Sequence, residues 1–91
     1  MIVAIDRVIN EAVDDIITRS GKHKGWLNKA RANVGRCESY KRLRTLDKTE
    51  LTRINMTLEE WKKEVTRLEQ LVAAYELVLT NLNALRNRDP K

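Results

Sequence analysis

The side chains able to carry out chemistry are few in this chain, and they do not form a recognisable group. The chain holds one histidine, His23, and one cysteine, Cys37. Acidic neighbours such as Asp14 and Asp15 point in different directions on a helix. A metal site needs several imidazole, thiolate or carboxylate ligands, and covalent catalysis needs a base beside its nucleophile. We therefore expect no enzymatic activity, no catalytic residue, no cofactor, no metal and no small-molecule substrate.

Positive charge is concentrated in the middle third of the chain. Residues 19–44 hold nine basic side chains and one acidic one, whereas residues 1–18 carry a net charge of −3. Such a local field attracts an anionic partner, and aromatic side chains among the basic ones can stack on bases. We expect the following residues to bind nucleic acid or an acidic or nucleoprotein partner: Arg19, Lys22, Lys24, Trp26, Lys29, Arg31, Arg36, Tyr40 and Arg42.

Two other interpretations of these residues remain open. In one, the charged side chains are simply solvated; in the other, they pair with the acidic residues 1–18 of the same or another chain. Trp26 is either an anchor that closes a bundle or an exposed contact for a partner. Cys37 is more typical of a small core residue than of a reactive thiol.

These residues must be positioned by secondary structure, and the strongest pattern for it lies near the C-terminus. Ten apolar residues follow one another there at alternating spacings of three and four, which is the heptad pattern of a coiled coil. This seam predicts one long helix over about residues 47–86, with core or oligomer packing along its length. The seam residues are Leu51, Ile54, Leu58, Trp61, Val65, Leu68, Val72, Tyr75, Leu79 and Leu82.

The ends of this long helix are also marked. Asp47 and Glu50 form a capping box at its start, and the Asp89–Pro90 pair is expected to end it. A second possible capping box permits a break near Asn55, but the seam passes that point in phase, which favours a continuous helix. Beside the seam, Leu71, Val78 and Leu85 form a second stripe, so the C-terminal half of the helix is expected to make contacts on two sides.

The first half of the chain predicts two shorter helices. An apolar repeat from Ile2 to Ile16 indicates a helix over about residues 2–19, and a short strand over residues 2–5 is the competing interpretation. Ser20, Gly21 and Gly25 then predict a basic loop that contains His23. A second helix is expected over about residues 26–44, with a weaker seam that runs through Leu27, Ala30, Val34 and Cys37.

Together these patterns predict one all-α domain over residues 1–91, in which two shorter helices pack on the long C-terminal one. A chain of this size buries little surface by itself, so we expect a homodimer. The single cysteine and the absence of a signal-type apolar segment favour the cytoplasm, and no apolar run is long enough to span a membrane.

Three hypotheses for function follow from this architecture. The first is a non-enzymatic helical protein that uses its basic region, residues 19–44, to bind nucleic acid or a complex that handles nucleic acid. The second is a small inhibitor, anti-defence protein or adaptor of the kind that phages encode, which docks on a protein machine and blocks it. The third is a structural coiled-coil component of a larger assembly.

Overall fold

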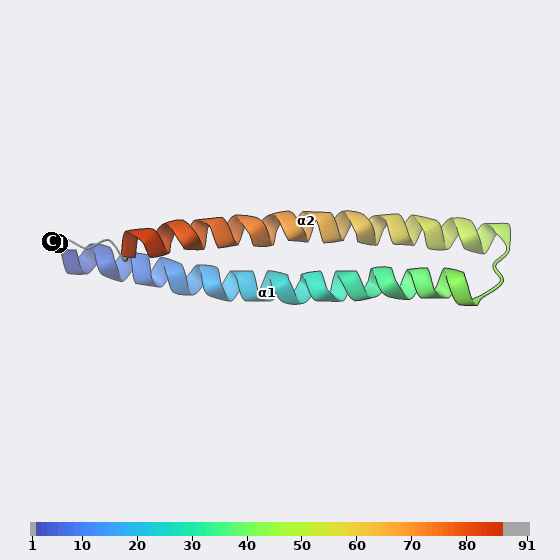
Figure 1. Cartoon of the computed structure of the whole chain (residues 1–91), viewed down its shortest axis with the longest axis horizontal. Coiled ribbons are helices and arrows are strands. Elements are labelled where there is room, and N and C mark those ends of the chain that lie inside the picture. The colour runs from blue at the N-terminus through green and yellow to red at the C-terminus, as the bar shows by residue number, and fades with distance from the viewer. Residues whose placement is uncertain (1, 87–91) are drawn as a thin grey trace.

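Two antiparallel α-helices form a long hairpin (Figure 1). The structure, a computed structural model, describes residues 2–86, with side chains from Ala4 onward. Helix α1 comprises Ile2–Leu43 and helix α2 comprises Lys48–Arg86. A short loop joins them, so residues from the start of α1 lie beside residues from the end of α2. The hairpin measures 69 × 16 × 15 Å.

The prediction of three helices is wrong, because residues 2–43 form a single helix. The predicted loop at residues 20–25 is helical, and so are residues 2–5, where a strand was the alternative. The two apolar stripes of this half are in the same heptad phase: Ile16, Ser20, His23 and Leu27 follow at spacings of four, three and four. One helix therefore keeps both stripes on one face.

Polar residues at seam positions hid this continuity from the sequence pattern. Ser20 is buried and His23 is half-buried, and both face α2 where an apolar residue would be expected. Gly21 and Gly25 lie on the exposed side of the same turns and have ordinary helical backbone, with no positive φ. Each glycine costs the helix about 1 kcal/mol relative to alanine, an amount that packing along a 42-residue helix can offset.

Helix α2 agrees with the long helix that the C-terminal seam predicts, and it runs through Asn55 without a break. Its capping bond is present, because the Glu50 backbone N–H donates to Asp47 Oδ1 at 2.8 Å. The expected stop at Asp89–Pro90 lies outside the described residues. The α2 seam faces α1, with Leu58 and Leu68 buried and the other seam residues half-buried, except for exposed Leu51.

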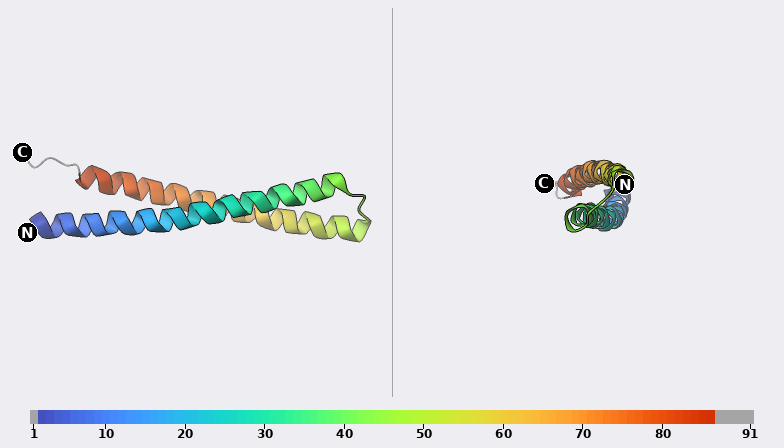
Figure 2. Two further views of the ribbon diagram at one scale, coloured as in Figure 1. Left: turned by 90° about the horizontal axis from the view of Figure 1, so that it is seen from below. Right: turned by 90° about the vertical axis from the view of Figure 1, so that its right-hand side faces the viewer.

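The core is a thin line of side chains between the two helices. Its main cluster joins Leu27 and Ala30 of α1 to Leu68 of α2, with Trp61 and Val65 packed against it. The two helices wind around each other, as Figure 2 shows from two further directions. Heptad seams impose this winding, because a straight helix drifts out of a seven-residue repeat. Within residues 2–86, neither helix is apolar enough over a sufficient length to cross a membrane.

Candidate functional site

The basic side chains of α1 lie on two different sides of the hairpin. Because the helix turns about 100° per residue, positions just after and just before the seam fall on opposite flanks. Lys24 and Arg31 lie on one side, which we call the charged flank. Lys22, Lys29 and Arg36 follow one another at intervals of seven residues toward the other side, and we call them the basic stripe.

On the charged flank, the basic groups already have partners within the chain. Lys24 Nζ lies 3.2 Å from Glu76 Oε1, and Arg31 Nη2 lies 3.0 Å from Glu69 Oε2. All four side chains are about half exposed, so each pair contributes modestly to stability. A partner that used these two residues would have to compete with the carboxylates of α2.

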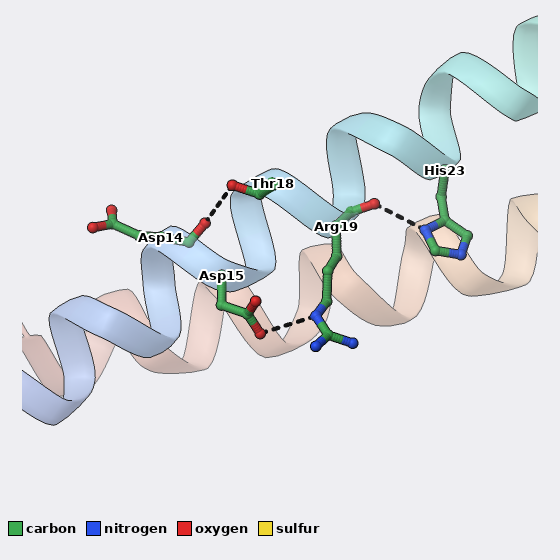
Figure 3. A network of polar contacts seen from close by, with 5 residues as sticks. All are labelled: Asp14, Asp15, Thr18, Arg19 and His23. Carbon is green, nitrogen blue, oxygen red and sulfur yellow. Dashed lines mark hydrogen bonds and ion pairs between the residues drawn. The ribbon is translucent and has the colours of Figure 1, made fainter.

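Arg19 is also paired, in this case within α1. Its Nε lies 3.0 Å from Asp15 Oδ2, one helical turn earlier (Figure 3). The hydrogen bond and the negative charge of Asp15 raise the pKa of Arg19 above its ordinary value. Three of the nine predicted site residues, Arg19, Lys24 and Arg31, therefore have acidic partners in the hairpin.

The basic stripe differs from these three residues. Lys22, Lys29 and Arg36 are exposed, and none of them forms an ion pair with another residue of the described part of the chain. Arg36 Nη1 donates to Asn33 Oδ1 at 3.0 Å, which orients its guanidinium along the helix without neutralising it. Intervals of seven residues place neighbouring charges about 10 Å apart on one helix face.

Toward the loop the basic stripe is followed by Tyr40 and Arg44, whereas Arg42 lies on the charged flank, where it lines a hollow with Glu38 and Lys62. The guanidinium carbon of Arg44 lies 4.9 Å from the centre of the Tyr40 ring, in a cation–π arrangement. Arg42 Nη2 donates to Ser39 Oγ at 3.5 Å, a long hydrogen bond that leaves the charge unpaired. Arg44 is not among the nine predicted residues; its signal in the sequence is the interval of four from Tyr40.

Trp26 lies at the middle of the hairpin, between the two helices on the side of the basic stripe. It is 50% exposed, and its ring meets that of His23 edge to face with centroids 4.8 Å apart. A shallow surface hollow of about 310 Å³ lies beside it. The hollow is lined by Trp26, Lys29, Ala30, Asn33, Trp61, Glu64, Arg67 and Leu68.

His23 is part of the packing between the helices, which corrects the prediction that it lies in a basic loop. Its ring centre is 5.0 Å from that of Tyr75 on α2, and its Nδ1 lies 2.8 Å from the Arg19 carbonyl oxygen (Figure 3). Cys37 is buried and forms no disulfide. Across residues 2–86 the structure brings together no group of three His, Cys, Asp or Glu side chains suited to a metal ion.

No protein-family model, curated protein or solved structure matches this chain. The distribution of charge and of exposed side chains on the hairpin is therefore the basis for a functional proposal. The charge is distributed unevenly along the length of the hairpin as well as between its two sides.

Proposed function

We propose that this protein is a non-catalytic helical hairpin that binds nucleic acid with its loop-proximal half, residues 27–67. The observation that carries the proposal is the position of the net charge. Residues 27–67 hold eleven basic and six acidic side chains, which accounts for the whole net charge of +5. The remaining segments of the sequence, residues 1–26 and 68–91, are each balanced between acidic and basic groups.

The geometry of the basic groups supports a polyanionic partner over a small acidic ligand. Lys29 and Arg36 are exposed and spread along one side of the hairpin, and Arg44 lies beyond them near the loop. A chain of phosphates can contact several such groups at once and release a counterion at each contact. Tyr40, which is 39% exposed beside Arg44, offers a ring on which an unpaired base can stack.

Binding of this kind is electrostatic and depends little on base sequence. Neither α1 nor α2 carries a compact set of side chains arranged to read base edges. Phosphate contacts therefore supply most of the affinity. The affinity should therefore fall steeply with salt, with a slope of about −0.9 per phosphate contact for double strands and about −0.7 for single strands.

The test measures the affinity of the full chain for single-stranded and double-stranded oligonucleotides over a range of salt concentrations. A Lys29→Gln/Arg36→Gln variant should bind more weakly, and its slope should shrink by about 1.4 to 1.8, because two phosphate contacts are lost. An Arg7→Gln/Arg86→Gln variant is the matched control. It loses the same charge at the opposite end of the hairpin and should retain the slope of the wild-type chain.

Two results would count against the proposal. One is an absence of measurable binding to either oligonucleotide at low salt. The other is an equal loss in both variants, because that would mean that net charge, and not the loop-proximal surface, determines the affinity. Circular dichroism of both variants establishes that the helical hairpin is intact in each comparison.

A protein partner is the second candidate, and one observation favours it. Leu43 is 81% exposed and Met56 is 63% exposed near the loop, and Met56 lines a hollow together with Lys48 and Arg53. Exposed apolar side chains surrounded by charge are typical of contacts with proteins. An adaptor or inhibitor that docks on an acidic surface, or on a machine that already holds nucleic acid, would use this end of the hairpin. Changing Leu43 and Met56 to Ser would then abolish capture of that partner while leaving oligonucleotide binding unchanged.

The cytoplasm is the compartment that best suits this proposal. Cys37 is the only cysteine of the chain, and its thiol is buried without a disulfide partner. A reducing compartment preserves such a thiol, and nucleic acid is accessible there.

A further inference from the structure

The half of the hairpin that does not carry the net charge has an apolar surface of its own. On α2, Leu71, Val78 and Leu85 follow at intervals of seven residues, in line with Glu64, which lines the hollow beside Trp26. Trp26 lies at one end of this surface, and Ala12 and Ile5 precede it on α1 by 14 and 21 residues, with Arg19 at the intervening position of the same row. We call this surface the apolar flank; its residues are Ile5, Ala12, Trp26, Leu71, Val78 and Leu85.

Most of the apolar flank is in contact with water in the single hairpin. Val78 is 43% exposed, Leu85 51% and Ile5 60%. The whole chain exposes 7310 Å², whereas a compact protein of 10.6 kDa exposes about 5,500 Å². Covering half of that excess on each of two chains would bury about 1,800 Å² in total, which lies within the range of stable protein interfaces.

We infer that a second copy of this chain covers the apolar flank in antiparallel orientation. The ends of the two hairpins that lie away from the loops then form a four-helix bundle. The two-fold axis crosses the rod at the level of Arg19 and Val78. The inference rests on the arrangement of residues around that point, and it is independent of the proposed binding of nucleic acid.

The stripe on α2 is complementary to its own reversed copy. Leu71 and Leu85 lie at equal intervals on either side of Val78. When the stripe is reversed about Val78, each Leu71 therefore meets Leu85 of the partner subunit. A two-fold interface requires this kind of self-complementarity, because each patch must fit itself.

The neighbouring positions on α1 show the same symmetry about Arg19. Ala12 and Trp26 lie seven residues on either side of it, so reversal places the small side chain against the large one. Asp15 lies four residues before Arg19, and Lys22 lies three residues after it. Reversal about Arg19 therefore places the Asp15 carboxylate of each chain beside the Lys22 ammonium group of the other. The two Arg19 side chains approach the axis, but each is already paired with its own Asp15 at 3.0 Å.

The two stripes have the same centre because of the register of the hairpin. The His23 and Tyr75 rings are in contact, with centroids 5.0 Å apart. Because the helices are antiparallel, Ser20, three residues before His23, lies at the same level as Val78, three residues after Tyr75. Arg19 is the neighbour of Ser20, so it lies close to the same level. A single axis at this level thus relates both stripes to their copies.

Charge favours this antiparallel pair over one in which the two hairpins lie parallel. A parallel pair would place each member of the basic stripe beside the same residue of the partner, with three like-charge contacts along the interface. In the antiparallel pair the acidic segment from residue 2 to residue 18 faces residues 20–36 of the other chain, which are basic. Reversal about Arg19 lays residues 2–36 of the two α1 helices alongside each other, so only the part of each hairpin beyond residue 36 projects from the ends of the bundle.

The first test measures the mass of the full chain in solution by sedimentation equilibrium. The expected mass is twice 10.6 kDa. A Val78→Lys variant, which places a charge on the axis, should raise the dissociation constant at least 100-fold, because two ammonium groups would be buried together. Leu77→Lys is the matched control, since Leu77 is the adjacent residue, is 63% exposed and points away from the flank. It should remain dimeric.

The second test examines the orientation with an exposed residue whose replacement leaves the hairpin intact. Lys22→Asp turns two attractive contacts of the antiparallel dimer into repulsive ones. It should raise the dissociation constant about tenfold at low salt and less at high salt. A Lys63→Asp variant, with the same change of charge outside the flank, should show no change.

Three results would overturn the inference. A wild-type chain that remains monomeric at high concentration would leave the flank to a different protein. Equal effects of Val78→Lys and Leu77→Lys would show that the dimer uses another surface. An unchanged dissociation constant for Lys22→Asp would refute the antiparallel orientation, because a parallel dimer merely exchanges one like-charge contact for another.

Discussion

Lys24 and Glu76 form an ion pair between the two helices, and Arg31 and Glu69 repeat it seven residues further along α1 and seven residues earlier on α2. The two pairs thus share one antiparallel register. Glu38 and Lys62 occupy the next repeat, where they line one surface hollow with the two charges exchanged between the helices. This pattern of charges favours the observed register, because a shift by one repeat would place like charges together.

Reversing one charge of this pattern should destabilise the hairpin, and reversing both should restore it. Lys24→Glu is expected to lower the free energy of unfolding by about 0.5 to 1 kcal/mol, since an attraction between half-exposed groups becomes a repulsion. The Lys24→Glu/Glu76→Lys double variant should recover most of the loss. Chemical denaturation at one protein concentration measures all three differences in a double-mutant cycle. Strictly additive effects would show that the two side chains do not interact in solution.

Replacing Gly25 with alanine should stabilise the protein. A methyl group at this position meets no atom within 4 Å, and the residue lies inside a continuous helix. The expected gain in the free energy of unfolding is about 0.5 to 1 kcal/mol, because alanine has the higher helix propensity. Thermal unfolding followed by circular dichroism gives the measurement, and Gly21→Ala should behave alike. A loss of stability in both variants would instead support a loop at residues 20–25.

Removing the cap of α2 should loosen the loop end of the hairpin. Asp47 Oδ1 accepts the Glu50 backbone N–H at 2.8 Å, and Asp47→Ala leaves that donor without its partner. The expected loss is about 1 kcal/mol, with faster amide hydrogen exchange in the first turn of α2. Asp47→Asn is the control, because an asparagine side chain also caps helices well. Equal losses in both variants would show that the negative charge, and not the hydrogen bond, provides the stabilisation.

The extent of α2 and its N-terminal cap could be predicted from the sequence because their signals are local. An apolar side chain at almost every seam position marks one helix face from Leu51 to Leu82, and Asp47 supplies the cap next to it in the chain. The all-helical class follows from the same periodicity. Neither signal requires knowledge of what the helix packs against.

The continuity of α1 could not be predicted in the same way. Ser20 and His23 occupy seam positions with polar side chains, and Gly21 and Gly25 lie on the same turns, so every local signal there indicates a break. The contact that overrides them is distant in sequence, since the His23 ring packs on Tyr75 of α2. The basic residues were likewise identified as one group, although only the fold shows which of them have acidic partners on α2.

The sequence by itself thus determined the helical class, the long seam of α2, its N-terminal cap and the concentration of positive charge, because each of these is a pattern among neighbours along one chain. Only the tertiary structure decided that residues 2–43 form one helix, that Lys24 and Arg31 are paired, and that Lys29 and Arg36 lie on a side with no ion-pair partner among the described residues. The physical reason is that pairing two long helices fixes their rotation about their own axes. That rotation determines which side chains meet the other helix and which face the solvent.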